Sequence, residues 1–295
     1  MTKVSVLMSV KNGLPYVRET VDSVLGQTLA DFTFLILDNA STDGTRDFLQ
    51  GIGDPRVRLE LLSEDVGQTA ALNTGLSIIQ TGLVARMDAD DVCLPERLER
   101  QIERFEADPD LALLGAAAEM IDERGRRIGE ARFPCKREKV LEHLPLGNPF
   151  VHASVMYRCE LALAVGGYPH DFTYAQDLAL WLRLAGKGGV ENLPETLVNI
   201  RVHEAQATRD ARLRSVRLED NLRLAREMES MALLPRRVRD AARLRQAFML
   251  WGLGNKSEAL RTIGGRGAVW LAGCAVNPIF WRAAWSRLRA GLSTL

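Results

Sequence analysis

The first ninety residues alternate apolar runs with helix-like segments, and this alternation limits the possible folds more than any other feature. Four short segments rich in Val, Leu and Ile have the lengths and turn-forming ends of strands: 4–10, 32–38, 56–62 and 82–88. Residues 15–26 and 67–80 carry apolar side chains at helical spacing, and "STDGT" opens another helix, for which we expect Ser41 or Thr42 as the cap. Repeated strand–helix–strand units with short connections predict a mainly parallel sheet with helices on both faces.

The rest of the chain is less regular. We expect a helix over 95–107 with Pro95 first, then two strands joined by a turn at Gly125. The further expected segments are helices at 159–169 and 174–189, an extended run at 190–203, and Arg-rich helices at 208–231 and 235–250. This order predicts an α/β domain over residues 1–207 and a basic, α-helical C-terminal extension over residues 208–295.

Charge is distributed unevenly along the chain. The formal net charge is zero, but Arg201 to Leu295 holds 18 Lys and Arg against 8 Asp and Glu. We therefore expect no nucleic-acid partner, since a uniform basic face is missing. The N-terminus enters a strand without a secretory leader, the four cysteines show no metal-ligand spacing, and the longest charge-free segment, Gly267 to Trp281, has 15 residues. A membrane-spanning helix needs roughly 20 apolar residues, so these features predict a cytoplasmic protein.

The end of the extension mixes aromatic and basic residues. Trp and Phe residues interleave there with arginines: Arg266, Trp270, Phe280, Trp281, Arg282, Trp285, Arg287 and Arg289. Such a mixture suits an interfacial helix beside anionic lipid, which would give peripheral contact at the inner face of the cell membrane. A helical subdomain packed on the main domain or on a second copy of the chain explains it equally well, and both interpretations stay open.

Polar side chains follow three of the predicted strands at the points where the strands end. Asn12, Asp38 and Asp88 occupy these positions, and in a parallel sheet ligands bind at the carboxyl ends of the strands. In "ARMDADDVCLPERL", Asp88, Asp90 and Asp91 lie within four positions, where like charges repel. Mg²⁺ or Mn²⁺ would remove that repulsion and would take a diphosphate as further ligand. The alternative is a solvated turn in which Asp91 caps the next helix.

Other candidate residues have two explanations each. Asp38 either accepts a hydrogen bond from a nucleobase N–H or closes an Asx turn within "DNASTDG". Asp177 is expected in the first turn of a helix, where the helix dipole alone favours a carboxylate. His203 follows an extended run and His152 lies in "NPFVHASVMYR", and each is either a structural histidine or a ligand.

Seven segments, in order, resemble the family 2 glycosyltransferases, the large inverting group with the GT-A fold. They are "VSVLMSVKNG", "SVLGQTLADFTFLILDNASTDGT", "GQTAALNTGL", "ARMDADDVCLPERLERQ", "NPFVHASVMYRCELALAVGGY", "YAQDLALWLRL" and "VNIRVHEAQAT". Together they span residues 4–208. The resemblance implies a GT-A-type nucleotide-binding sheet flanked by helices.

The resemblance also implies roles for individual residues. The donor nucleotide would be bound by Ser9, Val10, Asn12, Asp38, Asn73 and Asp88. Within this set, Asp38 would bind the base, and Asp88 would contact the ribose or the water shell of a metal. Asp90 would coordinate a divalent cation, Mn²⁺ or Mg²⁺, and His203 would contact that metal or the diphosphate. Asp177 matches the catalytic base.

The implied activity is a metal-dependent, inverting transfer of a sugar from a UDP-, dTDP- or GDP-sugar to a hydroxyl of a glycan or lipid-linked acceptor, in bacterial surface polysaccharide or glycolipid synthesis. Ser9 and Lys11 replace the family's Pro and Tyr, Asn39 replaces the second Asp after the second strand, and Gln176 replaces the Glu before Asp177. These departures put the donor preference in question. The alternatives are a sugar-nucleotide pyrophosphorylase and a non-catalytic module that binds nucleotide sugars.

Overall fold

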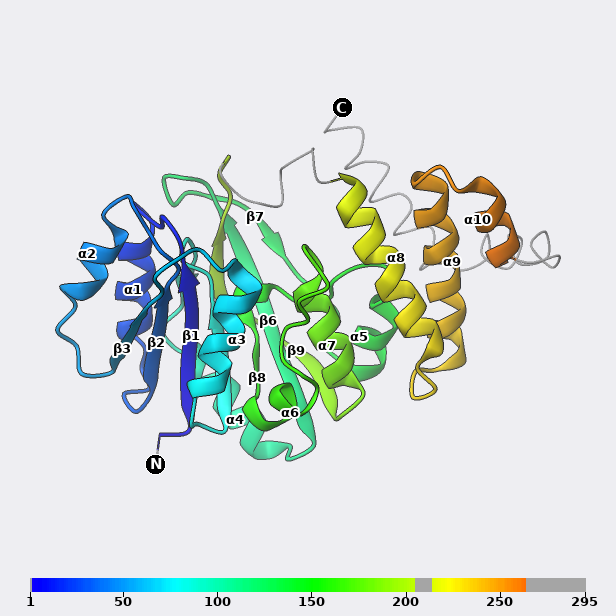
Figure 1. The fold of residues 1–295 in the computed structure, drawn as a ribbon. Coiled ribbons are helices and arrows are strands. Elements are labelled where there is room, and N and C mark those ends of the chain that lie inside the picture. The colour runs from blue at the N-terminus through cyan, green and yellow to red at the C-terminus, as the bar shows by residue number, and fades with distance from the viewer. Residues whose placement is uncertain (1, 205–213, 264–295) are drawn as a thin grey trace. The chain divides into compact units, whose positions relative to one another are not determined.

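The computed structural model describes residues 2–204 and 214–263 (Figure 1). Two compact units can be separated by their internal contacts. The described residues of 1–141 and 149–211 form the first unit, and those of 142–148 and 212–295 form the second. The boundary that we expect between residues 207 and 208 falls among residues 205–213, outside the described part, and stays a prediction.

The first unit is built on a nine-stranded sheet, in which β7 pairs only with β6 and the others follow the order β3-β2-β1-β4-β8-β6-β9-β5. The four strands expected from the early alternation are parallel neighbours: β1 (Val4–Val10), β2 (Thr33–Asp38), β3 (Val57–Leu61) and β4 (Leu83–Met87). The rest of the sheet is mixed: β5 (Val92–Cys93), β6 (Leu111–Ile121), β7 (Arg127–Ala131), β8 (Met156–Arg158) and β9 (Gly189–Arg201). The parallel half therefore carries the three predicted polar strand ends.

Helices cover both faces of this sheet (Figure 1). One face packs against α1 (Val17–Leu25), α2 (Thr45–Gln50) and α4 (Arg97–Ala107). The other packs against α3 (Gln68–Ile78), α6 (Cys159–Ala164) and α7 (Gln176–Ala185). Strand β1 shows why: Val6 and Met8 belong to the first core and Leu7 to the second, as the two-residue period of a strand requires. The α/β fold expected from the sequence is confirmed.

Several helices start later than expected, among them α1, which begins at Val17 rather than at Pro15. Neither Ser41 nor Thr42 caps α2, because the helix begins after Gly44, whose φ of 92° places it in the left-handed region. Helix α4 begins at Arg97 rather than at Pro95. Short elements for which we had no expectation are α5 (Arg137–His143) and the 3₁₀ turn η1 (His152–Ser154).

The second unit is helical in its described part. It contains α8 (Arg214–Ser230), α9 (Arg236–Gly252) and α10 (Lys256–Ile263), which share a core of apolar residues, Leu222, Ala247, Met249, Leu250 and Ala259. Across residues 2–204 and 214–263, no helix combines the length and the apolarity needed to cross a bilayer. The aromatic and basic residues that suggest an interfacial helix, from Arg266 to Arg289, lie outside the described residues.

Candidate functional site

The carboxyl ends of β1, β2 and β4 form one edge, and β1 lies between the other two strands. Val10 of β1 pairs with Asp38, the last residue of β2, and Met8 pairs with Met87, the last residue of β4. Asp88 follows directly. Neighbouring strands are about 4.8 Å apart, so Asp38 and Asp88 are separated by roughly 10 Å across β1. The two carboxylates therefore lie on the same edge of the sheet, on either side of β1.

The loops after β1 and β2 are held together by side-chain hydrogen bonds. The backbone N–H of Asn12 donates to Ser41 Oγ at 2.9 Å, and the Thr42 N–H donates to Asn12 Oδ1 at 2.8 Å. Asn12 has a φ of 55°, a left-handed conformation that asparagine tolerates better than most residues. The predicted pocket residues Ser9, Val10 and Asn12 therefore lead from β1 into a loop that is fixed against its neighbour.

Asp38 is fully buried and already has a cationic partner. Its Oδ2 lies 2.6 Å from Arg46 Nε of α2, and its Oδ1 accepts from the Ser41 N–H at 3.3 Å. Arg46 also donates to the Leu62 carbonyl at 2.7 Å. One Asp38 oxygen thus makes a local bond to the loop, though three residues on and not two as in an Asx turn, and Arg46, which the sequence did not single out, contacts the other.

Asp88 is oriented by a buried arginine on its own strand. Arg86 is fully buried, and its guanidinium lies 2.5 Å from Asp88 Oδ1, while His152 Nδ1 lies 3.6 Å from Asp88 Oδ2. Burial by itself would raise the pKa of Asp88, but the charges of Arg86, His152 and Arg97, with the hydrogen bond from Arg86, together outweigh it and hold that pKa below its usual range. Asp88 is therefore an ionised carboxylate at neutral pH.

Asp90 meets His203, although 113 positions separate them in the sequence. His203 Nε2 lies 2.9 Å from Asp90 Oδ2, and both side chains keep a minor exposed fraction, 12% and 29%. Asp91 turns inward instead: it is 5% exposed, and its Oδ1 accepts from the Arg201 N–H at 2.8 Å. The alternative of a solvated turn with Asp91 as a helix cap was wrong.

The three carboxylates keep much of their mutual repulsion. Burial and the charge of Asp88 raise the pKa of Asp90, and burial with the charges of Asp90 and Asp88 raises that of Asp91 well above its usual value. A cation beside Asp90 would relieve this repulsion. No group of three or more His, Cys, Asp or Glu side chains that could hold a metal occurs within the described residues. The pair of Asp90 and His203 nevertheless fits a Mg²⁺ or Mn²⁺ ion, which takes few protein ligands and completes its shell with water and phosphate oxygens.

An aromatic cluster connects Asp88 to helix α7. Tyr168 lies beside His152, with 3.4 Å between its hydroxyl and His152 Nε2, and the fully buried Trp181 of α7 packs on both rings with centroids 6.0 Å and 6.1 Å away. Burial raises the pKa of the Tyr168 hydroxyl, and the charges of Asp177 and Asp88 raise it further. Both carboxylates therefore lie within electrostatic reach of one ring.

Asp177 stands in the first turn of α7, one helical turn before Trp181. Its Oδ1 accepts from the Leu178 N–H at 2.6 Å. Because Trp181 is anchored in the aromatic cluster, the start of α7 is fixed relative to β4 and its acidic end. This geometry is compatible with a carboxylate facing a bound substrate, and equally with a carboxylate that stabilises the helix start, so the catalytic role stays a prediction.

Asn73 of α3 uses its amide on protein backbone. Nδ2 donates to the Tyr168 carbonyl at 2.7 Å, and Oδ1 accepts from the Tyr168 N–H at 2.8 Å. These bonds attach the loop before α7 to α3 and hold the Tyr168 ring beside His152. The contact of Asn73 with the donor nucleotide stays a prediction. The structure shows that the Asn73 amide also binds the backbone of Tyr168.

Sequence reasoning missed Arg86 and Arg201, two fully or almost fully buried arginines that contact the acidic segment. Each offered a signal. Arg86 interrupts an otherwise apolar strand, where a charge needs a buried partner. Arg201 is two residues before His203, and the alternation of a strand places both side chains on one face.

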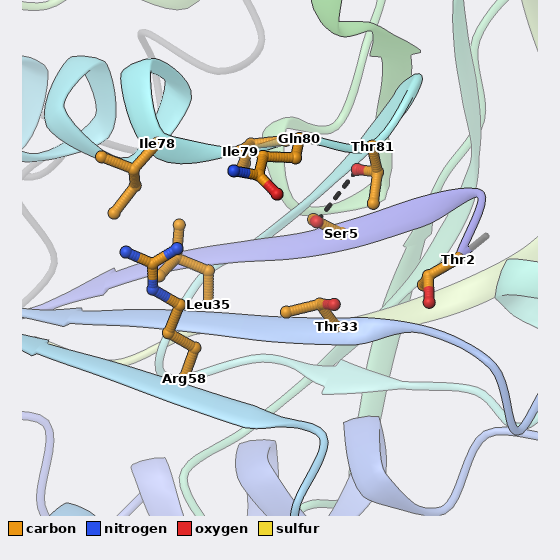
Figure 2. A pocket seen from close by; sticks show the side chains of 9 residues that line it. All are labelled: Thr2, Ser5, Thr33, Leu35, Arg58, Ile78, Ile79, Gln80 and Thr81. Atoms are coloured by element: carbon orange, nitrogen blue, oxygen red, sulfur yellow. Dashed lines mark hydrogen bonds between the residues drawn. The ribbon is translucent and has the colours of Figure 1, made fainter.

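A separate hollow lies toward the amino ends of β1 and β2. Its volume is about 360 Å³, and its lining includes Ser5, Arg58 and Thr81 (Figure 2). Thr81 Oγ1 donates to Ser5 Oγ at 2.9 Å, and the half-exposed Arg58 pairs with Glu60 at 2.9 Å. None of the predicted site residues lines it, so the candidate site is confined to the opposite edge of the sheet.

Comparison with known proteins identifies the family. Residues 5–162 match the model of glycosyl transferase family 2. The O-antigen biosynthesis glycosyltransferase WbnJ of Escherichia coli is 32% identical over 213 residues, covering 70% of this chain and 83% of that protein. The amylovoran biosynthesis glycosyltransferase AmsE of Erwinia amylovora is 39% identical over 141 residues, which are 48% of this chain and 52% of that relative.

Solved structures show the same fold at lower sequence identity. S. aureus TarS 1-349 in complex with UDP-GlcNAc aligns with a TM-score of 0.67 at 18% identity, over 84% of this chain and 71% of that chain. The mannosyltransferase PcManGT from Pyrobaculum calidifontis, in complex with GDP-Man and Mn²⁺, aligns with a TM-score of 0.62 at 19% identity, over 98% of this chain and 84% of that chain. With its GT-A-type fold and its match to the family model, the chain belongs to glycosyl transferase family 2 and is a glycosyltransferase.

Proposed function

We propose that the protein is a metal-dependent, inverting glycosyltransferase that moves a sugar from a nucleoside-diphosphate donor to a hydroxyl acceptor. The observation that carries this proposal is the contact between Asp90 and His203 at the carboxyl ends of the strands, where Asp38 and Asp88 also lie. Relatives named for amylovoran and O-antigen biosynthesis support a role in bacterial surface polysaccharide or glycolipid synthesis. The acceptor would then be a glycan or a lipid-linked glycan.

The donor would lie across the carboxyl ends of β2, β1 and β4. The base would lie near Asp38. There an N–H of uracil, thymine or guanine could donate a hydrogen bond to the carboxylate that Arg46 also contacts. Its nucleotide would run over the backbone and side chains of Ser9, Val10 and Asn12. Asp88, held ionised by Arg86, would accept from a ribose hydroxyl or from a metal-bound water. Asn73 is included in the donor site on the family pattern alone.

Asp90 and His203 would hold Mn²⁺ or Mg²⁺ beside the diphosphate. When bound, the ion would neutralise the charge that accumulates on the departing nucleoside diphosphate. The protein's own contribution would be a pair of ligands fixed 2.9 Å apart, in surroundings where burial and neighbouring carboxylates already favour added positive charge. A GDP-Man complex with Mn²⁺ is known for a structural neighbour and supports this choice of ions.

Asp177 would act as the general base. Its carboxylate would take the proton of the acceptor hydroxyl while that oxygen forms a bond to the anomeric carbon. The bond from the same carbon to the diphosphate oxygen would break on the opposite face, and its electron pair would leave with the nucleoside diphosphate. One displacement at this carbon inverts its configuration.

A donor screen tests the proposal. The full chain is incubated with UDP-, dTDP- and GDP-sugars, with Mn²⁺, with Mg²⁺ or with a chelator, and the release of nucleoside diphosphate is followed. We expect release from one class of donor, its loss with the chelator, and its loss in Asp90→Asn. Asp54→Asn is the matched control, because it makes the same change in a loop before β3 and should retain the wild-type rate.

Other outcomes of the screen would contradict the proposal. Metal-independent release that survives Asp90→Asn would remove the metal site. Pyrophosphate formed from a nucleoside triphosphate and a sugar phosphate would identify a pyrophosphorylase. Donor binding by calorimetry without transfer to any of a wide panel of acceptors would identify a non-catalytic binding module.

For its location we propose the cytoplasm, with contact at the inner face of the membrane or self-association through the C-terminal extension. The excess of basic residues from Arg201 to Leu295 supports contact with anionic lipid. Flotation of the full chain with vesicles of neutral lipid and of anionic lipid distinguishes membrane contact from self-association. We expect flotation only with the anionic vesicles, and a dimer in sedimentation without flotation would favour self-association.

A further inference from the structure

Arg201, the last residue of β9, is a buried cation at the acidic edge of the sheet. It is 2% exposed, and its guanidinium carbon lies 4.7 Å from the centre of the Tyr16 ring. Tyr16 in turn lies against His203, with ring centroids 5.1 Å apart. One aromatic ring therefore supports both Arg201 and the histidine two positions later.

Arg201 contacts the acidic segment at two points, one on a side chain and one on the backbone. Its N–H donates to Asp91 Oδ1 at 2.8 Å, and its Nε donates to the Asp90 carbonyl at 3.0 Å. His203 meets the Asp90 carboxylate from the same strand end. The main chain of Asp90 is thus held by the last residue of β9, and its side chain by a residue two positions beyond the end of that strand.

The remaining guanidinium contacts reach two further segments. Nη1 donates to the carbonyls of Asp122 and Glu123, at 3.2 Å and 3.5 Å, in the turn between β6 and β7. Nη2 forms an ion pair with Glu19 of α1. A single planar group connects α1, the acidic segment, the β6–β7 turn and the end of β9, and only arginine offers enough donors in a fixed plane for these contacts.

We infer that Arg201 is a positioning residue for the metal-ligand pair, which sets the distance and direction between the Asp90 carboxylate and the His203 imidazole. This inference rests on the proposed function. Groups that orient the ligands of a metal ion usually change its affinity 10- to 100-fold when they are replaced. Arg201 would do so here through the Asp90 carbonyl and the Asp91 carboxylate, without being a ligand of the ion itself.

Arg158 offers a matched control at the other end of the sheet. It is also a strand arginine that donates to backbone carbonyls, those of Leu111 at 2.8 Å and Pro109 at 2.9 Å, and its guanidinium carbon lies 5.4 Å from the Phe105 ring. It pairs with Leu83, the first residue of β4, whereas the acidic segment follows the last residue. Arg158→Lys therefore imposes a similar structural loss without touching the candidate metal site.

Mn²⁺ binding to the full-length protein tests the inference without using activity. Free Mn²⁺ is measured by electron paramagnetic resonance, with Mn²⁺ alone and with Mn²⁺ plus UDP or GDP, well below the unfolding temperature. For Arg201→Lys we expect the Kd for Mn²⁺ to rise about 10- to 100-fold, because one ammonium cannot reproduce the planar set of contacts. Arg158→Lys should remain within twofold of wild type.

The outcomes are separable. Equal Mn²⁺ affinity in Arg201→Lys and wild type would overturn the inference and leave the proposed function intact, whereas no Mn²⁺ binding by wild type, with or without nucleotide, would overturn both. An equal loss of affinity in the two lysine variants would show a general structural effect and would also overturn the inference. If Arg201→Lys does not fold, Tyr16→Leu removes the ring under Arg201 and His203, and it should raise the Kd for Mn²⁺ at least threefold.

Discussion

Replacing Asp177 with asparagine separates the chemical role of this carboxylate from its structural role. The asparagine Oδ1 can keep the 2.6 Å hydrogen bond from the Leu178 N–H, and Trp181 continues to anchor α7. The variant therefore loses a charge and a proton acceptor but no packing contact. A general base contributes about 10² to 10⁴ in rate, which corresponds to roughly 3–5 kcal/mol in the barrier.

The structural cost of the same change is small. A carboxylate in the first turn of a helix contributes about 0.3–1 kcal/mol through the helix dipole, so Tm should fall by at most about 4 °C. The kcat for transfer is measured at saturating donor and acceptor, and the donor Kd by calorimetry. We expect kcat to fall about 10²- to 10⁴-fold and the donor Kd to stay within twofold.

Asp47→Asn is the control for this prediction, because Asp47 occupies the first turn of α2 and bears the same relation to a helix dipole. It should change Tm by a similar amount and leave kcat unchanged. A transfer rate in Asp177→Asn within threefold of wild type would show that the dipole explanation is sufficient and that another group takes the proton.

Two predictions concern stability. Burial lowers the pKa of His152 to about 4, so the unfolded chain binds its proton near pH 6.5 and the folded chain does not. The free energy of unfolding should therefore fall by about 3 kcal/mol between pH 6.5 and pH 4. In His152→Gln, urea unfolding should lose that part of the pH dependence. An unchanged dependence of the unfolding free energy on pH would contradict the assignment to His152. A Cβ at Gly75 would lie 2.4 Å from Leu7 Cδ1 and 2.8 Å from Leu37 Cδ1, so Gly75→Ala should cost about 1–3 kcal/mol by overpacking. Gly82→Ala, with nothing within 4 Å of its Cβ, is the control, and equal melting temperatures of the two variants would refute the packing argument.

The parallel half of the sheet was predictable because its signals are local. A buried strand such as Val4–Val10 shows continuous apolar residues, and the turn after it shows "KNG", so both the element and its polar end can be found within ten residues. Helix starts were less predictable. "NASTDGT" contains several residues that favour caps, and the choice of Gly44 depends on bonds that Asp43 and Thr45 make with the loop after β1.

The partners of the acidic residues could not be predicted, since they come from distant positions. Asp90 and His203 are 113 positions apart, and the Asp91 carboxylate and the Arg201 N–H are 110 apart. The spacing of apolar residues along the sequence does not predict contacts between such distant positions. These contacts depend on the register between β5 and β9. The resemblance to the family put Asp90 and His203 in one site, and its closing segment "VNIRVHEAQAT" contains Arg201, but it gave that arginine no role.

The charges around the acidic segment explain why a cation could be bound together with its substrate. Arg86 pairs its charge with Asp88, and the backbone N–H of Arg201 donates to Asp91, so protein groups already contact two of the three carboxylates. The Asp90 carboxylate faces the imidazole of His203, and burial with the charge of Asp88 raises the pKa of Asp90. One carboxylate and one histidine give a weak site for Mg²⁺ or Mn²⁺, and a diphosphate would supply the oxygens that are missing. It follows that Mn²⁺ should bind more tightly with UDP or GDP present than alone, and that this gain should be lost in Asp90→Asn.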